Sequence, residues 1–129
     1  MEKIKWVTAK DIFRIHDDII MTSGGLPGIN AHASVHAIAA RVENHAYYVG
    51  VSDFIELAAL LAVAITNGHA FNDGNKRTAL ISLNVFLEIN GYSLFAVPLE
   101  LADMFVKIAS GEIKEKQFAE WLRRRVDSH

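Results

Sequence analysis

The chain has 129 residues, a length that suits one domain and is short for two. Hydrophobic residues make up 51% of it, which is enough to build a core, and the net charge of −2 argues against a nucleic-acid-binding protein because these usually carry a basic surplus. The absence of cysteine excludes a disulfide framework, thiol catalysis and thiolate metal sites.

Hydrophobic patterning argues against a membrane protein. The most apolar stretch, residues 57–65, is far shorter than the ~20 residues that span a bilayer. The first residues lack the continuous apolar segment of a signal peptide. We therefore expect a soluble, cytoplasmic protein with no membrane segment.

The N-terminal third of the sequence predicts two helices. Thr8 is placed to cap a first helix, with Asp11 completing a capping box, and the glycine-rich residues 24–28 end it. A second helix is expected over residues 33–48, and its apolar face should consist of Val35, Ile38, Ala39 and Val42. Both helices are amphipathic, so each should cover a core.

The next two helices are apolar nearly all round and should lie at the centre of the domain. The first should run over residues 54–65 with Ser52 as its N-cap, and Asn67-Gly68 should stop it. The second should run from Asn75 to Ile89. They are the two central helices of the predicted fold.

The C-terminal third predicts two further helices. Residues 93–97 are expected to be extended, Pro98 should start a helix to Ala109, and a last helix should cover residues 114–126. The arginines at 123–125 suit a solvated helix end that complements the helix dipole, with contact to a partner as the alternative. The sequence thus predicts one all-α domain of about six helices over residues 1–129.

Six residues, 69–74, connect the two central helices and carry more chemistry than a structural turn needs. A helix N-terminus at Asn75 offers unpaired N–H groups and a positive dipole end, both suited to phosphate. Gly74 lets backbone approach a ligand, and Lys76 and Arg77 add positive charge. The pattern favours an anion site at this helix start.

Two other side chains of this connection suit phosphate chemistry. Asp73 is a hard oxygen ligand for Mg²⁺ bound to a polyphosphate. His69, with an ordinary pKa near ~6.5, can take a proton from a hydroxyl at neutral pH. Phe71 should pack inward as the anchor of the loop.

Each of these residues alone also has an ordinary structural explanation. His69 could be a histidine favoured at a helix C-terminus, and Asp73 or Asn75 could be only the next N-cap. Lys76 and Arg77 could be solvated surface charges. Cations in a first helical turn are electrostatically unfavourable unless an anion binds there, however, so the joint pattern favours a functional site.

Residues 69–79, His-Ala-Phe-Asn-Asp-Gly-Asn-Lys-Arg-Thr-Ala, resemble the motif H-x-F-x-[DE]-G-N-K-R-T-A of the Fic/Doc superfamily, and its death-on-curing (Doc) toxin branch in particular. Similar strings at residues 24–28, 86–92, 109–113 and 121–122 extend this resemblance over nearly the whole chain. The resemblance implies the all-α Fic fold and a toxin of a toxin–antitoxin pair.

The same resemblance implies a role for each motif residue. His69 would be the general base for a hydroxyl of a target protein, and Asp73 would hold Mg²⁺. Catalysis would further involve Lys76 and Arg77. The nucleotide phosphates would be bound by five residues, namely Asn72, Gly74, Asn75, Lys76 and Arg77.

Two departures from the AMP-transferring pattern H-P-F-x-[DE]-G-N-G-R-x-x-R bear on the reaction. Lys76 stands where those enzymes have glycine, and Leu80 stands where they have a second arginine. Both features match the Doc branch, which transfers the γ-phosphate of ATP to a threonine of elongation factor Tu and halts translation. We therefore expect a Mg-ATP-dependent protein kinase, with AMP transfer or a purely nucleotide-binding regulatory domain as alternatives.

The resemblance also bears on partners. Many Fic proteins inhibit themselves through an in-chain [ST]-x-x-x-E-[GN] helix, but the best match here, Glu43-Asn44, has Ala39 at the Ser/Thr position. An antitoxin acting in trans is therefore expected. Residues 47–51 could be the flap that grips the target segment, or a plain interhelix loop. His32 and His36 have the spacing of a metal pair without a third ligand, so we expect surface residues.

Overall fold

The computed structural model describes residues 3–48, 50 and 53–129, and its first helix begins and ends where the sequence predicts. Helix α1 spans Ala9–Ser23. The Thr8 amide donates to Asp11 Oδ2 at 2.9 Å and the Asp11 amide donates to Thr8 Oγ1 at 3.2 Å, which is the predicted capping box. Gly24 then ends the helix in a backbone conformation with φ 83° that glycine adopts without strain.

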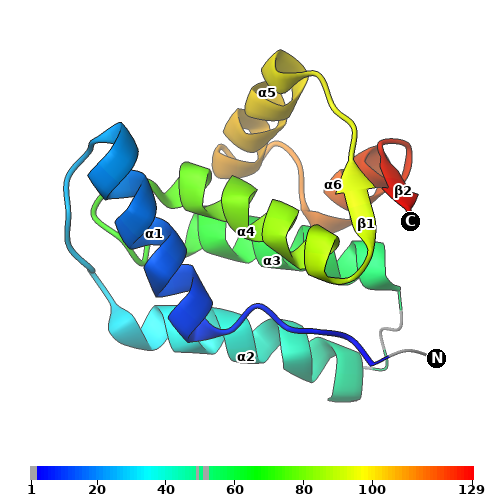
Figure 1. Cartoon of the computed structure of the whole chain (residues 1–129), viewed down its shortest axis with the longest axis horizontal. Coiled ribbons are helices and arrows are strands. Elements are labelled where there is room, and N and C mark those ends of the chain that lie inside the picture. Colours follow the sequence, from blue (N-terminus) through cyan, green and yellow to red (C-terminus); the bar gives the residue numbers. More distant parts are fainter. Residues whose placement is uncertain (1–2, 49, 51–52) are drawn as a thin grey trace.

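The two central helices are α3, Phe54–Gly68, and α4, Asn75–Ile89. Every residue from 57 to 66 in α3 is buried, because this helix is apolar on all sides and is surrounded by the others. The two helices run side by side through the middle of the molecule (Figure 1). The predicted central pair is confirmed.

The remaining helices enclose this pair. Helix α2, His32–Tyr48, packs against α3 on one side, where α1 also contacts α4. Helix α5, Pro98–Ala109, and helix α6, Glu115–Arg123, pack against α3 on the other side (Figure 1). The fold is all-α with six helices in the described part of the chain, as expected, and none of those helices is long and apolar enough to cross a membrane.

The C-terminal end differs from the prediction. Helix α6 ends at Arg123 rather than Val126, and Val126–Ser128 forms a strand, β2, antiparallel to β1, Tyr92–Leu94, with Tyr92 opposite Ser128. The amide of Phe95 donates to the Arg125 carbonyl oxygen at 2.6 Å and continues this pairing. The amphipathic pattern of residues 114–126 could not reveal it, because the partner strand lies far away in the sequence.

The arginines at 123–125 are not simply a solvated helix end, which corrects the expectation. Arg123 pairs with Asp53 and Glu120, and the Arg125 guanidinium lies 4.2 Å from the centre of the Trp121 ring. Arg123 thus ties α6 to the start of α3. Asp53, not Ser52, caps α3, accepting from the Ile55 and Glu56 amides; Ser52 lies outside the described residues.

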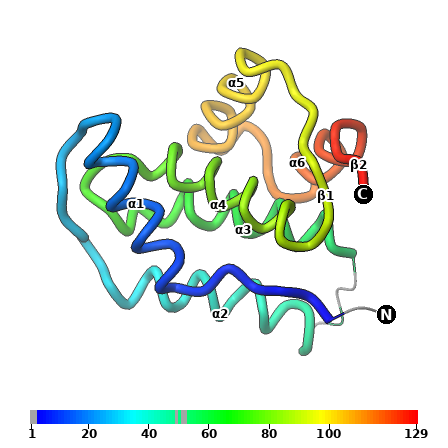
Figure 2. Tube along the Cα trace, in the orientation of Figure 1, coloured from blue at the N-terminus to red at the C-terminus, as the bar shows by residue number. Residues whose placement is uncertain are grey.

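The segments that carry the motif meet at one end of the molecule. The C-terminus of α3, the N-terminus of α4 and the C-terminus of α1 lie together there, beside the connection between α1 and α2 (Figure 2). The strands and the chain termini lie at the opposite end (Figure 2). The fold therefore brings the motif loop and the residue 24–31 loop to one place.

Candidate active site

His69 follows the last residue of α3 and has a left-handed backbone, with φ 47° and ψ 37°. It is the one non-glycine residue with positive φ in the described part of the chain. Such backbone strain is retained mainly where function requires it. The His69 side chain is exposed and makes no hydrogen bond to another described residue, so a ring nitrogen is free to accept a proton from a ligand.

Phe71 anchors the motif loop, as the sequence predicts. Its side chain is buried, and the Asn75 side chain brackets its backbone. Asn75 Nδ2 donates to the Phe71 carbonyl oxygen at 2.9 Å, and the Phe71 amide donates to Asn75 Oδ1 at 3.2 Å. The Asn75 side chain is therefore used to close the loop, and only its backbone N–H faces a possible phosphate.

The Asp73 carboxylate is held by two backbone N–H groups. The Leu26 amide donates to Oδ2 at 3.1 Å, and the Gly74 amide donates to Oδ1 at 2.8 Å. These bonds, led by that from Leu26 and assisted by the nearby Arg77 charge, lower the pKa of Asp73 below its ordinary value of 3.8. The carboxylate is therefore ionised at neutral pH.

The N-terminus of α4 has no side-chain cap. Gly74 occupies the N-cap position with φ 81°, a left-handed conformation that favours glycine, and no side chain accepts from the first-turn N–H groups. The first turn holds no acidic residue, and Lys76 there is exposed with no ion-pair partner among the described residues. This combination of free N–H groups and a free cation suits an anion.

Arg77 is half-exposed and turned toward the loop that follows α1. Its Nη1 donates to the Gly24 carbonyl oxygen at 2.9 Å, and its Nη2 lies 3.9 Å from Asp73 Oδ1. A guanidinium has five N–H donors, so these contacts leave others for a phosphate. The structure thus shows contacts of Arg77 with Gly24 and Asp73 that the sequence does not predict.

Residues 24–31 contact the motif loop, whereas the sequence predicts for residues 24–28 a helix-ending turn and a string shared with the family. The amides of Asn30 and Ala31 donate to the Ala70 carbonyl oxygen at 2.7 and 3.1 Å, and the Asn72 amide donates to the Gly28 carbonyl oxygen at 3.2 Å. This pairing surrounds a β-bridge between Ile29 and Phe71. The motif loop therefore pairs with the α1–α2 connection along its backbone.

Of residues 47–51, which the sequence offers as a flap or a plain loop, the structure describes Tyr47, Tyr48 and Gly50. Val49 and Val51 lie outside the described residues, and the Tyr47 ring lies 6.2 Å from that of Trp6. Tyr47 and Tyr48 end α2 at the side of the molecule opposite the motif loop (Figure 1). The described part of residues 47–51 is therefore remote from the motif.

His16 is a contact of the motif that the sequence analysis did not single out. Its side chain is 1% exposed, its Nε2 lies 2.7 Å from the Asp73 carbonyl oxygen, and its ring stacks on Phe71 with centroids 3.8 Å apart. The sequence signal that could have found it is its place on the apolar face of α1, four residues after the buried Ile12.

A single hollow of about 230 Å³ collects every predicted site residue. Its lining is Thr66, His69, Asn72, Asp73, Gly74, Asn75, Lys76, Arg77 and Ala109. Asn72 lies at its rim, where its Nδ2 donates to the Pro27 carbonyl oxygen at 3.2 Å. The predicted residues are therefore together in space as well as in sequence.

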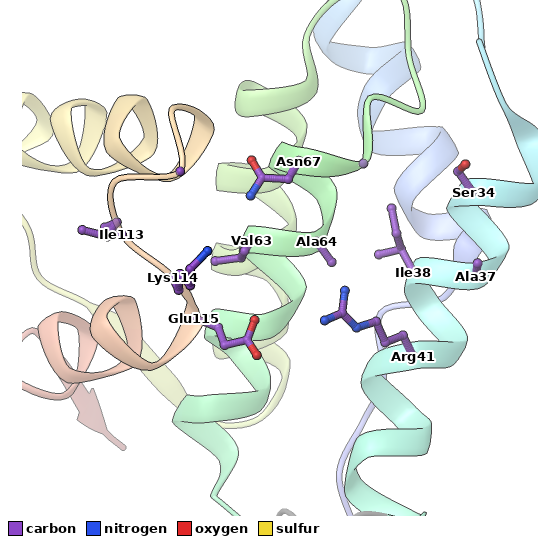
Figure 3. Close-up of a pocket in the computed structure, with 12 residues that line it drawn as sticks. Ser34, Ala37, Ile38, Arg41, Val63, Ala64, Asn67, Ile113, Lys114 and Glu115 are labelled. Atoms are coloured by element: carbon purple, nitrogen blue, oxygen red, sulfur yellow. The ribbon is translucent and has the colours of Figure 1, made fainter.

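A second hollow, of about 460 Å³, lies between α2, α3 and the turn before α6 (Figure 3). Arg41 from α2 and Glu115 from α6 extend toward each other across it, and Ala64 of α3 lies at its floor (Figure 3). None of the predicted site residues lines it. The smaller hollow around the motif is therefore the candidate active site, although this second hollow is larger.

Asp73 fits the single protein ligand of a phosphate-bound Mg²⁺. No cluster of three potential metal ligands exists among the described residues, so this part of the chain offers no all-protein metal cage. Mg²⁺ commonly takes one or two carboxylates and completes its shell with water and substrate phosphates. The Asp73 carboxylate is ionised, half-exposed and beside the uncapped α4 N-terminus, and each oxygen keeps a further lone pair.

Comparison with known proteins identifies the family. The model of the Fic/DOC family matches residues 6–87, which include α1 to α3, α4 up to Leu87, and the whole motif. The chain belongs to the Fic/DOC family. This Fic/DOC chain is also 40% identical over 125 residues to a protein named Protein kinase doc from Escherichia phage P1, covering 97% of this chain and 98% of the relative. The family resemblance drawn from the motif is thereby confirmed.

Proposed function

We propose that this Fic/DOC chain is a Mg-ATP-dependent protein kinase that phosphorylates a threonine hydroxyl of a target protein. We further propose that the target is elongation factor Tu and that the chain is the toxin of a toxin–antitoxin pair. One observation carries the proposal: an exposed His69 ring and the uncapped, cationic N-terminus of α4 line the same hollow. The name of the phage P1 relative supports the kinase activity.

His69 supplies the base. A ring nitrogen takes the proton of the target hydroxyl while that oxygen forms a bond to the γ-phosphorus. The bond between the γ-phosphorus and the bridging oxygen breaks, so ADP leaves with the electron pair and the target becomes a phosphoprotein. The side chain is suited to this role because it is exposed and free of hydrogen bonds to described residues.

The α4 N-terminus supplies the phosphate site. The backbone N–H groups of its first turn face developing negative charge, and Lys76 adds a full positive charge at the same end. Gly74 lines the same hollow, and its N–H holds the Asp73 carboxylate beside the phosphates. Arg77 lines the same hollow and adds a second charge from its wall. Positioning and charge neutralisation account for most of the catalysis of phosphoryl transfer.

Asp73 would hold Mg²⁺ at the edge of this phosphate site. The ion, when bound, supplies positive charge that bridges and neutralises phosphate oxygens. The Leu26 N–H holds the carboxylate from the side of the α1–α2 connection, so its position depends on that loop as well as on the motif. Asn72 and the Asn75 backbone complete the proposed phosphate-binding set.

The test is transfer of label to the target protein. The purified chain is incubated with Mg²⁺, elongation factor Tu or bacterial lysate, and ATP labelled at either the α- or the γ-phosphate, beside the His69→Ala and Lys76→Gly variants. Label from γ-ATP alone, lost in His69→Ala, supports the kinase. Label from α-ATP instead means AMP transfer, and no label from either, on target confirmed unmodified beforehand, contradicts the proposed reaction.

We propose that inhibition comes from a separate antitoxin protein in the cytoplasm. The inhibitory string [ST]-x-x-x-E-[GN] has no full match in the sequence, and its nearest match has Ala39 in place of Ser or Thr. The expected result of a pull-down from the native host is a second small protein recovered in equal amount. Repeated recovery of the chain alone would contradict this proposal.

A further inference from the structure

We propose that His16 is a positioning residue that fixes the peptide between Asp73 and Gly74, and thereby aims the Gly74 N–H at the Asp73 carboxylate, which keeps that carboxylate oriented at the nucleotide site. The inference rests on the proposed function in one respect, namely that Asp73 belongs to the nucleotide phosphate site. It adds a residue from α1, outside the motif, to the machinery of the site.

The geometry assigns the proton on the His16 ring. Its Nε2 lies 2.7 Å from the Asp73 carbonyl oxygen, and because a carbonyl only accepts, Nε2–H must be the donor. Nδ1 is buried, has no hydrogen-bond partner among the described residues, and lies 3.8 Å from Asp17 Oδ1. Among the described residues, the buried ring therefore makes its only hydrogen bond to the backbone of the motif.

A planar trans peptide transmits this contact to Gly74. The C=O of residue 73 and the N–H of residue 74 belong to one rigid plane and point in opposite directions. Holding the oxygen toward His16 therefore directs the Gly74 N–H away from α1, where it now donates to Asp73 Oδ1 at 2.8 Å. Asp73 and Gly74 both line the candidate site.

Gly74 makes such a restraint necessary. Glycine adopts positive and negative φ with similar ease, so a flip of the 73–74 peptide would meet little steric resistance at this residue, whose φ is 81°. A flipped peptide would turn its carbonyl oxygen toward the Asp73 carboxylate in place of the N–H, and would remove one of the two backbone donors that hold that carboxylate. A donor at His16 opposes that flip, since the flipped peptide would leave its buried Nε2–H without an acceptor.

The alternative is that His16 only fills space. Its ring lies parallel to Phe71, with an interplanar angle of 7°, and a Cβ at Gly74 would sit 3.5 Å from its Cδ2, an ordinary packing contact. Two substitutions separate the roles. His16→Phe keeps a flat ring against Phe71 and removes the donor, whereas His16→Gln keeps an N–H the same number of bonds from the backbone and removes the ring.

The test measures binding of Mg-ATP by calorimetry and the melting temperature of each variant. We expect His16→Phe to bind about 10- to 100-fold more weakly at a melting temperature near that of the wild type, the effect typical of lost support around a ligand site. His16→Gln should bind within a few-fold of the wild type even if it melts earlier. His36→Phe on α2, an exposed histidine also beside an aromatic ring, is the control. Wild-type binding by His16→Phe, or weaker binding by His16→Gln than by His16→Phe, overturns the proposal.

A measurement on the unaltered chain guards against variants that do not fold. Nitrogen-15 NMR of the wild-type His16 ring should show Nε2 protonated, with the Nε2–H protected from exchange. A ring protonated on Nδ1 with Nε2 bare would overturn the proposal. If the wild type transfers no label to its target but the binding pattern above holds, the proposed reaction fails and the positioning role stands. If the wild type transfers label and His16→Phe binds Mg-ATP normally, the proposed reaction stands and the positioning role fails.

Discussion

The guanidinium of Arg77 donates a 2.9 Å hydrogen bond to the carbonyl oxygen of Gly24, and so joins the second charge of the motif to the first residue after α1. The adjacent Leu26 N–H holds the Asp73 carboxylate. The α1–α2 connection therefore supports both charged side chains of the motif from outside it. Its glycines leave the room that these side chains occupy.

Gly25→Ala should displace both side chains. A Cβ at Gly25 would lie 2.7 Å from Asp73 Oδ2 and 2.9 Å from Arg77 Nη2, so the carboxylate and the guanidinium must both move. We expect weaker Mg-ATP binding and slower transfer, measured by calorimetry and by the labelling assay. Gly111→Ala is the matched control, because φ is also positive there and a Cβ meets nothing within 4 Å.

Both variants should lose stability, since an L-residue at positive φ costs about 1–2 kcal/mol. Only Gly25→Ala should also lose nucleotide affinity. If the two variants bind Mg-ATP equally well at 25 °C, Asp73 and Arg77 do not depend on this close approach, and the α1–α2 connection is no part of the site.

His69→Asn should separate chemistry from folding. Asparagine accepts the left-handed backbone of this position and lacks the basic ring nitrogen, and the exposed His69 ring makes no packing that would be lost. We expect transfer to fall by about 10²- to 10⁴-fold, the usual contribution of a general base, with Mg-ATP affinity and melting temperature unchanged. A variant with full transfer would show that another group takes the proton.

Lys76→Ala should weaken Mg-ATP binding and reduce its dependence on salt. Lys76 is the second residue of α4 and is exposed with no ion-pair partner among the described residues, so a bound phosphate is its natural counter-ion. Lys116→Ala provides a close control, because Lys116 is the exposed second residue of α6, another helix start. Equal affinities of the two variants across a salt series would remove Lys76 from the phosphate site.

Most of the fold could be predicted because its signals are local. The Thr8 capping box, Gly24 and Pro98 mark helix boundaries by their own backbone chemistry, and the apolar run of α3 indicates a central helix. The end of α6 could not be predicted, since strand Val126–Ser128 depends on a partner more than thirty positions earlier in the chain. Non-local pairing leaves no periodic pattern in one segment.

The candidate site shows the same division between local and non-local information. The motif residues are contiguous, so their shared location could be predicted, and the structure places them around one hollow. Their support could not be predicted: His16 and the Leu26 N–H reach Asp73 from α1 and its following loop. Such contacts depend on how α1 packs across α4, and this packing cannot be predicted from the sequence of either segment alone.

The ion pair of Asp53 with Arg123 should make stability depend on acid pH. The Arg123 side-chain hydrogen bond lowers the pKa of Asp53 below its ordinary value of 3.8. A lowered pKa in the folded state means that the unfolded chain binds the extra proton first, so the stabilisation is complete above pH about 5 and is lost as pH falls through the folded-state pKa. The pair is more than a third exposed, so we expect only about 0.2–1 kcal/mol from it.

Asp53→Asn tests this dependence, because asparagine keeps the cap on α3 and removes the charge. Urea unfolding at pH 7 should show the variant less stable by that amount, and the difference should shrink as pH falls through the lowered pKa of Asp53 and the carboxylate becomes protonated. Arg124→Gln, at an exposed neighbouring arginine with no ion-pair partner among the described residues, should show no such convergence. A difference that persists unchanged at low pH would mean that Asp53 acts through its cap and not through Arg123.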